Sequence, residues 1–188
     1  MSRPVVLSGP SGCGKSTILQ RVLREYPDQY AVCISHTTRK PRAGERHGVE
    51  YYFTTKAEMT EAIERGEFLE HAEFGGNLYG TSLESVRSIQ RAGKRCILDI
   101  EIQGVRAVRK SKLNPICVLL KPPSMAVLES RLRDRGTETE EAIQKRLNLA
   151  LKDLKAAEAE SELFDYVIIN DDIDQAYREL CSLLSSKE

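Results

Sequence analysis

The chain has 188 residues, 40% of them hydrophobic, and its 28 Lys and Arg balance its 28 Asp and Glu. This length favours a single domain with a substantial core, and the composition argues against a disordered chain. Charge neutrality argues against bulk binding to nucleic acid or an anionic membrane, and no apolar run approaches the roughly 20 residues of a membrane span. We therefore expect a cytoplasmic monomer without a nucleic-acid or membrane partner.

The cysteines and histidines show no disulfide or metal-binding pattern. The five cysteines are widely spaced and contain no C-x-x-C pair, and the three histidines do not cluster. Such spacing is typical of reduced thiols in a cytosolic protein. The sequence therefore predicts neither a disulfide framework nor a zinc site.

Short apolar segments alternate with helical patterns along most of the chain. Nearly continuous apolar runs are typical of strands covered on both faces, and strand–helix alternation favours a parallel sheet with crossover helices. The predicted helices span residues 16–24, 125–134, 140–160 and 174–184. The predicted strands of the parallel sheet span residues 5–8, 31–35, 96–100, 116–120 and 166–169.

Residues 49–83 break this alternation and predict a lobe inserted between core strands. Short segments bounded by turn residues favour antiparallel strands, with a turn at residues 75–77 between the last two. These strands are expected over residues 49–53, 67–74 and 78–79. Because no linker or low-complexity tract is visible, the lobe should belong to the same folding unit as the core.

Two capping-box patterns predict where helices begin in and beside this lobe. Thr55 with Glu58, and Thr81 with Glu84, match the pattern in which a Thr side chain accepts a backbone N–H and a Glu three residues later reaches back. We therefore expect one helix after Thr55 and another after Thr81, the second ending at Gly93.

Residues 9–16 read Gly-Pro-Ser-Gly-Cys-Gly-Lys-Ser and match the phosphate-binding pattern G-x-x-x-x-G-K-[ST]. They follow a predicted strand and open a predicted helix, the context that separates this motif from a glycine-rich turn without a ligand. Backbone N–H groups and the helix N-terminus attract phosphate, Lys15 reaches the β- and γ-phosphates, and the Ser16 hydroxyl can ligate Mg²⁺. We predict nucleotide contacts for Gly9, Ser11, Gly12, Cys13, Gly14, Lys15, Ser16 and Thr17.

Cys13 lies within this loop and has two interpretations. Lys15 and the helix N-terminus would favour a thiolate, which would make the side chain redox-sensitive. Alternatively, Cys13 is a small residue whose side chain plays no part in the site. The sequence favours the second interpretation.

Residues 35–51 carry a second motif, S-x-T-T-R-x-P-R-x-x-E-x-x-G-x-x-Y, which resembles the GMP-binding segment of the guanylate kinase family. Two arginines and a tyrosine suit a phosphate dianion, because guanidinium groups bind oxyanions bidentately and keep their charge. The resemblance implies that Arg39, Arg42 and Tyr51 hold the phosphate of GMP, joined by Tyr79. Taken alone, the segment is equally consistent with a basic surface loop.

The resemblance extends to Glu70, and implies that this carboxylate binds the guanine base. Guanine presents N1–H and N2–H₂ donors on one edge, whereas adenine presents a lone pair at N1 and no amine at C2. A carboxylate placed there can reject the wrong base by about 10⁴. The resemblance also implies hydroxyl contacts to the base from Ser35 and Thr81. Without the motif, Glu70 would be interpreted as a solvent-facing strand carboxylate.

Two acidic residues, Asp99 and Glu101, lie at the end of the third predicted core strand. An acid at a strand end beside a phosphate loop suits the orientation of Mg²⁺ and its waters, so Asp99 would act with Ser16 on the metal. Glu101 stands where the family often has Asp, near the acceptor base, and it keeps the acceptor charge despite its longer side chain. We expect GMP contacts for both acids.

A third block resembles the mobile lid of nucleoside monophosphate kinases. Arg131 and Arg135 are four residues apart and hence lie on one helix face. The resemblance implies that Arg135 and Arg146 clamp the phosphates in transfer, and that Arg131 lies near the adenine of ATP, as does the turn at Asn170 and Asp171. The alternative is a charged helix with pairs between neighbouring turns, which is our interpretation of the intervening Arg133.

Over nearly the whole chain, the resemblance implies an ATP:GMP phosphotransferase that requires Mg²⁺. The expected fold is a three-layer α/β/α P-loop kinase with a five-stranded parallel sheet, a small mixed β/α GMP-binding lobe and a helical lid. We expect the core at about residues 1–35, 84–124 and 147–188, the lobe at about 36–83 and the lid at about 125–146.

Catalysis by such an enzyme needs no protein nucleophile, because the GMP phosphate is one already. Positioning and electrostatic stabilisation are sufficient. The alternative function is a guanylate kinase-like module that binds phosphorylated proteins without catalysis. The residues expected to act in the transfer itself are Lys15, Arg39, Arg42, Asp99, Arg135 and Arg146.

Overall fold

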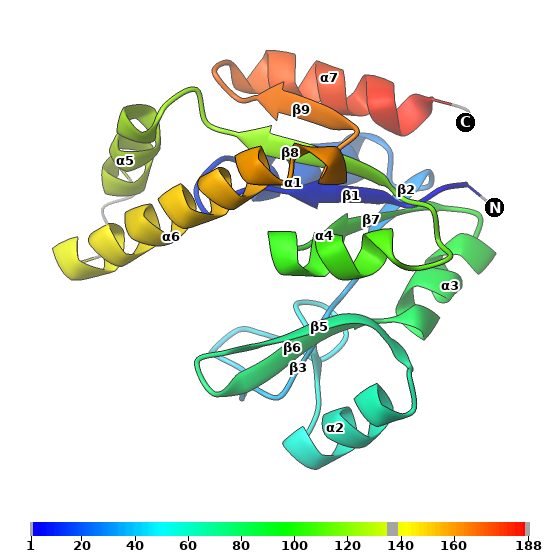
Figure 1. The fold of residues 1–188 in the computed structure, drawn as a ribbon. Helices are drawn as coiled ribbons and strands as arrows, with labels where there is room; N and C mark the ends of the chain where they lie inside the picture. The colour runs from blue at the N-terminus through cyan, green and yellow to red at the C-terminus, as the bar shows by residue number, and fades with distance from the viewer. Residues whose placement is uncertain (1, 135–138, 187–188) are drawn as a thin grey trace.

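The computed structural model describes residues 2–134 and 139–186. Its core is a five-stranded parallel sheet in the order β2-β7-β1-β8-β9, with helices above and below it (Figure 1). The predicted α/β class with a five-stranded parallel sheet is therefore confirmed. The strands of this sheet are β1 (Val5–Ser8), β2 (Tyr30–Val32), β7 (Arg95–Asp99), β8 (Ile116–Lys121) and β9 (Tyr166–Ile169).

Both faces of the sheet are buried at its central strands, which explains why those strands are almost entirely apolar. Side chains alternate along a strand, so Val5 and Leu7 of β1 pack on one face against helices α1 and α7. Val6 points to the other face and joins a cluster with α3 and α4. The four helices are α1 (Lys15–Glu25), α3 (Leu83–Arg91), α4 (Ile102–Arg109) and α7 (Ile173–Ser185).

A second, four-stranded sheet has the order β4-β3-β6-β5, and helix α2 (Lys56–Glu64) lies beside it. Its hairpin joins β5 to β6 through Gly75 and Gly76, whose φ angles of 58° and 76° suit a tight two-residue turn. The predicted turn is thus at the expected place. The strands are β3 (His36–Thr37), β4 (Tyr52–Phe53), β5 (Phe68–Phe74) and β6 (Asn77–Ser82).

One predicted strand direction in this sheet was wrong. The segment 49–53 was expected to pair antiparallel, but β4 pairs parallel to β3. The physical reason is the long connection 38–51, which carries the chain back to the end of the sheet where β3 began. A crossover of that length can join parallel neighbours, whereas a short hairpin turn cannot.

The first predicted capping box is present and the second is shifted by one residue. The Thr55 hydroxyl accepts the backbone N–H of Glu58 at 3.2 Å, and the Glu58 carboxylate accepts the N–H of Thr55 at 3.0 Å. Helix α3, however, is capped by Ser82, whose hydroxyl accepts the N–H of Ser85 at 3.1 Å. Thr81 is instead a buried residue of β6, and its hydroxyl is used elsewhere.

Helix α4 has no counterpart in the sequence prediction. It begins directly after Glu101, whose side chain makes no capping hydrogen bond, and it contains Gly104. Both features hide a helix from pattern reasoning, because the usual start signal is missing and Gly disfavours helix interiors. The helix is formed because Val105 and Val108 bury themselves against the sheet.

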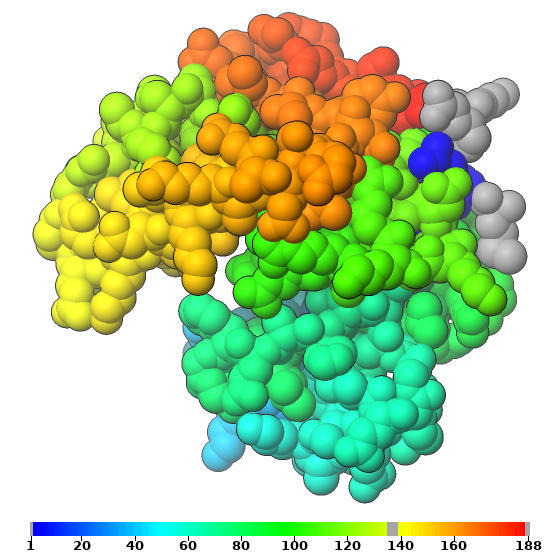
Figure 2. Space-filling view, viewed as in Figure 1, coloured from blue at the N-terminus to red at the C-terminus, as the bar shows by residue number. Residues whose placement is uncertain are grey.

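Helices α5 (Met125–Asp134) and α6 (Glu140–Ala159) project together beyond the sheet (Figure 1). They share a small apolar cluster that includes Leu128, Leu132 and Leu147. Figure 2 shows a notch between α6 and the β5–β6 hairpin. A short 3₁₀ helix (Ser161–Leu163) follows α6. Within residues 2–134 and 139–186, no helix combines the length and apolar character that a membrane crossing requires.

Candidate active site

The phosphate-binding loop connects β1 to α1 and is held by close packing at two glycines. A Cβ on Gly9, with φ 151°, would lie 2.0 Å from the carbonyl oxygen of Leu120. A Cβ on Gly14, with φ 102°, would lie 2.3 Å from the side-chain nitrogen of Asn170. These positions therefore accept only Gly, and the loop is fixed against β8 and the turn after β9.

A cavity of about 420 Å³ lies against this loop and is lined by most of the predicted nucleotide-binding residues. The Lys15 Nζ donates to the carbonyl oxygens of Gly9 and Pro10 at 2.6 and 3.3 Å, and lies 4.0 Å from Asp99. The ammonium group is thus at the mouth of the loop. The loop residues that line the cavity are Gly9, Ser11, Gly12, Gly14, Lys15, Ser16 and Thr17.

Cys13 differs from the other loop residues because its side chain belongs to the core. It is fully buried within the cluster of β1, α1 and α7. Burial raises the pKa of its thiol, and this effect outweighs the opposite influence of Lys15. A neutral, buried thiol is the environment expected of a packing residue, and it argues against the redox interpretation.

The residues expected to hold magnesium provide oxygen atoms on one side of the same cavity. Ser16 is the second residue of α1, and Asp99 is the last residue of β7. Burial raises the pKa of Asp99, while Lys15 acts in the opposite direction. Hydroxyl and carboxylate oxygens suit Mg²⁺. Among the described residues, no group of three or more His, Cys, Asp or Glu side chains could hold a metal.

A second cavity of about 330 Å³ adjoins the first and contains the predicted acceptor residues. Tyr51, Asp99 and Glu101 line both cavities, so the two spaces share a wall. Such a wall would allow two bound molecules to meet at it. The predicted GMP-binding residues that line the second cavity are Ser35, Tyr51, Glu70, Tyr79, Asp99 and Glu101.

Glu70 is a buried carboxylate at the inner end of this second cavity, with 9% of its surface exposed. The interpretation as a solvent-facing strand residue was therefore wrong. Burial raises the pKa of Glu70, whereas hydrogen bonds from Thr81 lower it. Thr81 thus acts on the carboxylate and does not line the cavity. Space for Glu70 depends on Gly104, where a Cβ would lie 3.2 Å from Oε2 of Glu70.

Arg39 is held by Glu45, a partner that the sequence reasoning did not assign. The guanidinium donates to both carboxylate oxygens of Glu45 at 2.9 Å, and the same carboxylate accepts the backbone N–H of Arg42 at 2.8 Å. The Arg39 guanidinium also lies 5.4 Å from the ring centre of Tyr51, and the rings of Tyr51 and Tyr79 are 6.0 Å apart. Glu45 thus orients the side chain of Arg39 and the backbone of Arg42, and Tyr51 lies beside both Arg39 and Tyr79. The only sequence signal for Glu45 was its place in the motif.

The predicted adenine contacts also come together. Arg131 Nη2 donates to the carbonyl oxygen of Asp171 at 3.3 Å, and Asn170 Nδ2 donates to the carbonyl oxygen of Cys13 at 2.7 Å. In the described part of the chain, Arg131 Nη1 and Asn170 Oδ1 are buried without a hydrogen-bond partner. Such atoms are available to a ligand, because buried polar groups are rarely left unpaired.

The predicted lid contains three further arginines, Arg133, Arg135 and Arg146. Arg133 pairs with Glu129 and Glu140 at 2.8 Å each, so its interpretation as a helix-surface residue is confirmed. Arg146 lies on α6, in the segment that follows α5. Arg135 lies outside the residues that the structure describes.

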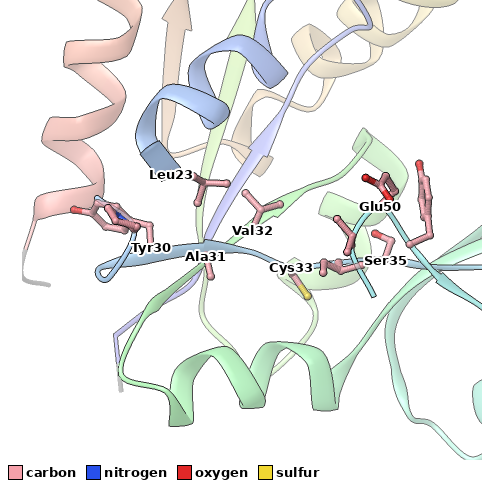
Figure 3. A pocket seen from close by; sticks show the side chains of 11 residues that line it. Leu23, Tyr30, Ala31, Val32, Cys33, Ser35 and Glu50 are labelled. Atoms are coloured by element: carbon pink, nitrogen blue, oxygen red, sulfur yellow. The ribbon is translucent and has the colours of Figure 1, made fainter. Parts of the chain in front are cut away.

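A third cavity, of about 460 Å³, lies along the free edge of β2 (Figure 3). It is bounded by Leu23 of α1, by residues 30–35 and by Glu50. Ser35 lines this cavity on one side and the acceptor cavity on the other. In the link 33–35 between the two sheets, Cys33 is still packed in the core, and Ser35 is the residue that borders both cavities.

The fold and these cavities define a P-loop phosphotransferase. A glycine-rich loop with its lysine closes one cavity, and the adjoining cavity offers a buried carboxylate together with the hydroxyls of Ser35, Tyr51 and Tyr79. This arrangement suits transfer of a phosphoryl group to a second small molecule.

Comparison with known proteins places the chain within this class. The sequence model of the family described as Guanylate kinase matches residues 1–187. The human guanylate kinase is 52% identical over 98% of this chain and 93% of its own length, and the Schizosaccharomyces pombe guanylate kinase is 46% identical over 95% and 88%. The chain therefore belongs to the guanylate kinase family, and is an ATP:GMP phosphotransferase.

Solved structures agree with this assignment. A guanylate kinase from Anaplasma phagocytophilum has a TM-score of 0.70 at 30% identity, over 98% of this chain and 86% of that one. An SH3-kinase fragment of tight junction protein 3, in its apo form, has a TM-score of 0.58 at 18% identity, over 97% and 56%. The second similarity shows the fold alone.

Proposed function

We propose that the enzyme binds Mg·ATP at the phosphate loop and GMP in the Glu70 cavity, and transfers the γ-phosphoryl group across their shared wall. The observation that carries this assignment is that Tyr51, Asp99 and Glu101 line both cavities. Two reactants held on either side of one wall need only a short approach to react in line. The residue roles below follow from this arrangement.

On the donor side, Lys15 binds the β- and γ-phosphates as they replace the loop carbonyls as its partners. Ser16 would hold Mg²⁺ directly and Asp99 would hold it through water. When bound, the metal neutralises charge on the phosphate oxygens. Arg131, Asn170 and Asp171 surround the adenine, a role supported by the two unpaired buried atoms in that corner.

On the acceptor side, Arg39, Arg42, Tyr51 and Tyr79 hold the GMP phosphate. The bidentate contact between Arg39 and Glu45 supports the role of Arg39, because a guanidinium that is already oriented loses less freedom on binding. The roles of Tyr51 and Tyr79 are supported by their place in the cavity lining. Glu70 accepts the two guanine donors and Ser35 adds a hydroxyl contact to the base, while Thr81, which does not line the cavity, acts through its hydrogen bonds to Glu70. A buried carboxylate is costly unless something binds it, so its burial favours a ligand role.

The lid and the lobe complete the site by closing. Arg146, with Arg135, clamps the transferring phosphoryl group, because two phosphorylated anions repel and need fixed cations between them. Closure also excludes water as a competing acceptor. The position of Ser35 between two cavities, in the link that joins the core to the lobe, supports a hinge at that residue. The proposed division is core at about 1–35, 84–124 and 147–188, lobe at 36–83 and lid at 125–146.

We assign the enzyme to the cytoplasm, as a monomer acting on ATP and GMP without a nucleic-acid or membrane partner. The equal numbers of acidic and basic residues, 28 each, support the absence of a polyanionic partner.

The test is ADP production from Mg·ATP with GMP, dGMP, AMP, CMP, UMP or dTMP offered separately. Strong turnover with GMP, weaker turnover with dGMP and almost none with the others would support the site assignment. Turnover with another monophosphate would reject the role of Glu70. No turnover with any acceptor would favour the non-catalytic phosphoprotein-binding module.

A further inference from the structure

Asp153 of α6 is a carboxylate at the donor site, and it has no part in the proposed function. It lines the cavity of the phosphate loop together with Lys15, Asp99 and Glu101. It also lines a small cavity that is bounded by Gly9 and Pro10 of the loop. Two separate cavities thus place Asp153 directly beside the loop, although it comes from the helix that carries Arg146.

The charge of Asp153 acts on the same groups as the established site residues. Partial burial raises the pKa of Asp153, and Lys15 acts in the opposite direction. Burial raises the pKa of Glu101, and the charge of Asp153 adds to that increase. Within residues 2–134 and 139–186, Asp153 has no ion pair closer than 4 Å and no side-chain hydrogen bond. Its carboxylate is therefore not explained by a structural partner.

A plain surface charge on an amphipathic helix is the simpler interpretation, and Glu158 fits it. Glu158 is exposed and lies 3.8 Å from Lys121. Asp153 differs because it is half-buried and faces the loop, where an unpaired carboxylate costs more than at the surface. At that position it repels an incoming polyphosphate unless a cation lies between them.

We propose that Asp153 is a positioning residue that makes nucleotide binding depend on a divalent cation, because it brings a third carboxylate, after Asp99 and Glu101, to face the single lysine of the loop. This inference rests on the proposed donor site. With Mg²⁺ present the attraction between the acidic wall and the metal ion offsets the repulsion of the phosphates, and without the metal the same wall repels ATP. Asp153 therefore links α6 to the metal-bound form of the donor.

The test is the binding of ATP, without GMP, measured by titration calorimetry in Mg²⁺ and in EDTA. For the wild type we expect tighter binding in Mg²⁺. In Asp153→Asn the affinity in EDTA should rise by about three- to tenfold with a smaller change in Mg²⁺, so that the ratio of the two affinities shrinks. Asp153→Glu should keep the wild-type ratio, and so should the matched control Glu158→Gln.

The outcomes separate this inference from the proposed function. An unchanged ratio in Asp153→Asn would overturn the inference alone, and so would an equal loss of affinity in both buffers, which a purely structural role predicts. Thermal unfolding of each variant identifies the latter case. Failure of the wild type to bind ATP in either buffer would reject the proposed donor site and the inference together.

Discussion

The side-chain amide of Asn170 donates to the carbonyl oxygen of Cys13 at 2.7 Å, across 157 positions of sequence. The contact ties the turn after β9 to the middle of the phosphate loop. Asn170 is buried, and a Cβ at Gly14 would already be too close to its amide. The loop conformation thus depends on a residue near the other end of the chain.

Replacement of Asn170 by Ala should therefore weaken both folding and donor binding. The unpaired carbonyl of Cys13 should lower the free energy of unfolding by about 1–3 kcal/mol, measured by urea denaturation, and the KM for ATP should rise while the KM for GMP changes little. Asn148→Ala, at an exposed position on α6, provides the control. A change in the KM for GMP as large as that for ATP would contradict this interpretation.

Glu70→Gln should lower kcat/KM for GMP by about 10², because a neutral amide cannot accept both guanine donors and a hydrogen bond to a charged group is among the stronger ones. The KM for ATP should stay close to the wild-type value. Glu73→Gln, on the same strand but exposed and 3.6 Å from Lys56, should behave as the wild type. Equal effects of the two substitutions would remove Glu70 from base recognition.

The pH dependence of GMP binding should report the burial of Glu70. Because burial raises the pKa of Glu70 above its ordinary value of 4.5, the carboxylate takes up a proton at a higher pH than an exposed one. The KM for GMP should therefore rise as the pH is lowered, and the rise should be smaller in Glu70→Gln, where only the phosphate of GMP, with a second pKa of about 6, still titrates.

The same raised pKa has the opposite consequence for stability. The folded state binds the proton more tightly than the unfolded state, so ionised Glu70 destabilises the fold above its folded pKa, and that cost disappears as the pH falls through it. Glu70→Gln should consequently raise the resistance to urea at neutral pH. A loss of stability there would mean that Thr81 and its neighbours more than offset the burial of the charge.

Glu45→Gln should raise the KM for GMP by about three- to tenfold with a smaller effect on kcat, because Arg39 loses one charged partner that orients its guanidinium. Steady-state kinetics at varied GMP measures this change. Glu50→Gln, a carboxylate of the same loop that accepts the backbone N–H of Arg46, is the matched control. A lower KM in Glu45→Gln would show that Glu45 competes with the phosphate instead of preparing its site.

The sequence was sufficient for the parallel sheet and the phosphate loop, because both depend on short-range patterns. The strands around Val6 and Val118 are apolar since both sheet faces are covered, and the loop motif determines its own backbone. The acceptor residues were predicted as well, although the resemblance and not the chemistry of single residues carried that step. Glu70 alone would have been placed at the surface.

The features that could not be predicted from the sequence depend on tertiary contacts, or, for the cap of α3, on a shift of one residue. Ser82 caps α3 because Thr81 turns its hydroxyl to Glu70, and a capping pattern does not register that competition. The direction of β4 depends on the path of residues 38–51. Helix periodicity places Asp153 on α6 but does not reveal that this part of α6 meets the phosphate loop.

The wall common to the two cavities has a consequence for changing what the enzyme accepts. Substitutions at Tyr51, Asp99 or Glu101 alter donor and acceptor binding together. A tolerated residue at these positions must therefore suit both substrates. Glu70 and Ser35 line only the acceptor cavity of the two. Acceptor preference can therefore be redesigned, or drift between relatives, at the base end of the cavity while the phosphoryl-transfer apparatus is left intact.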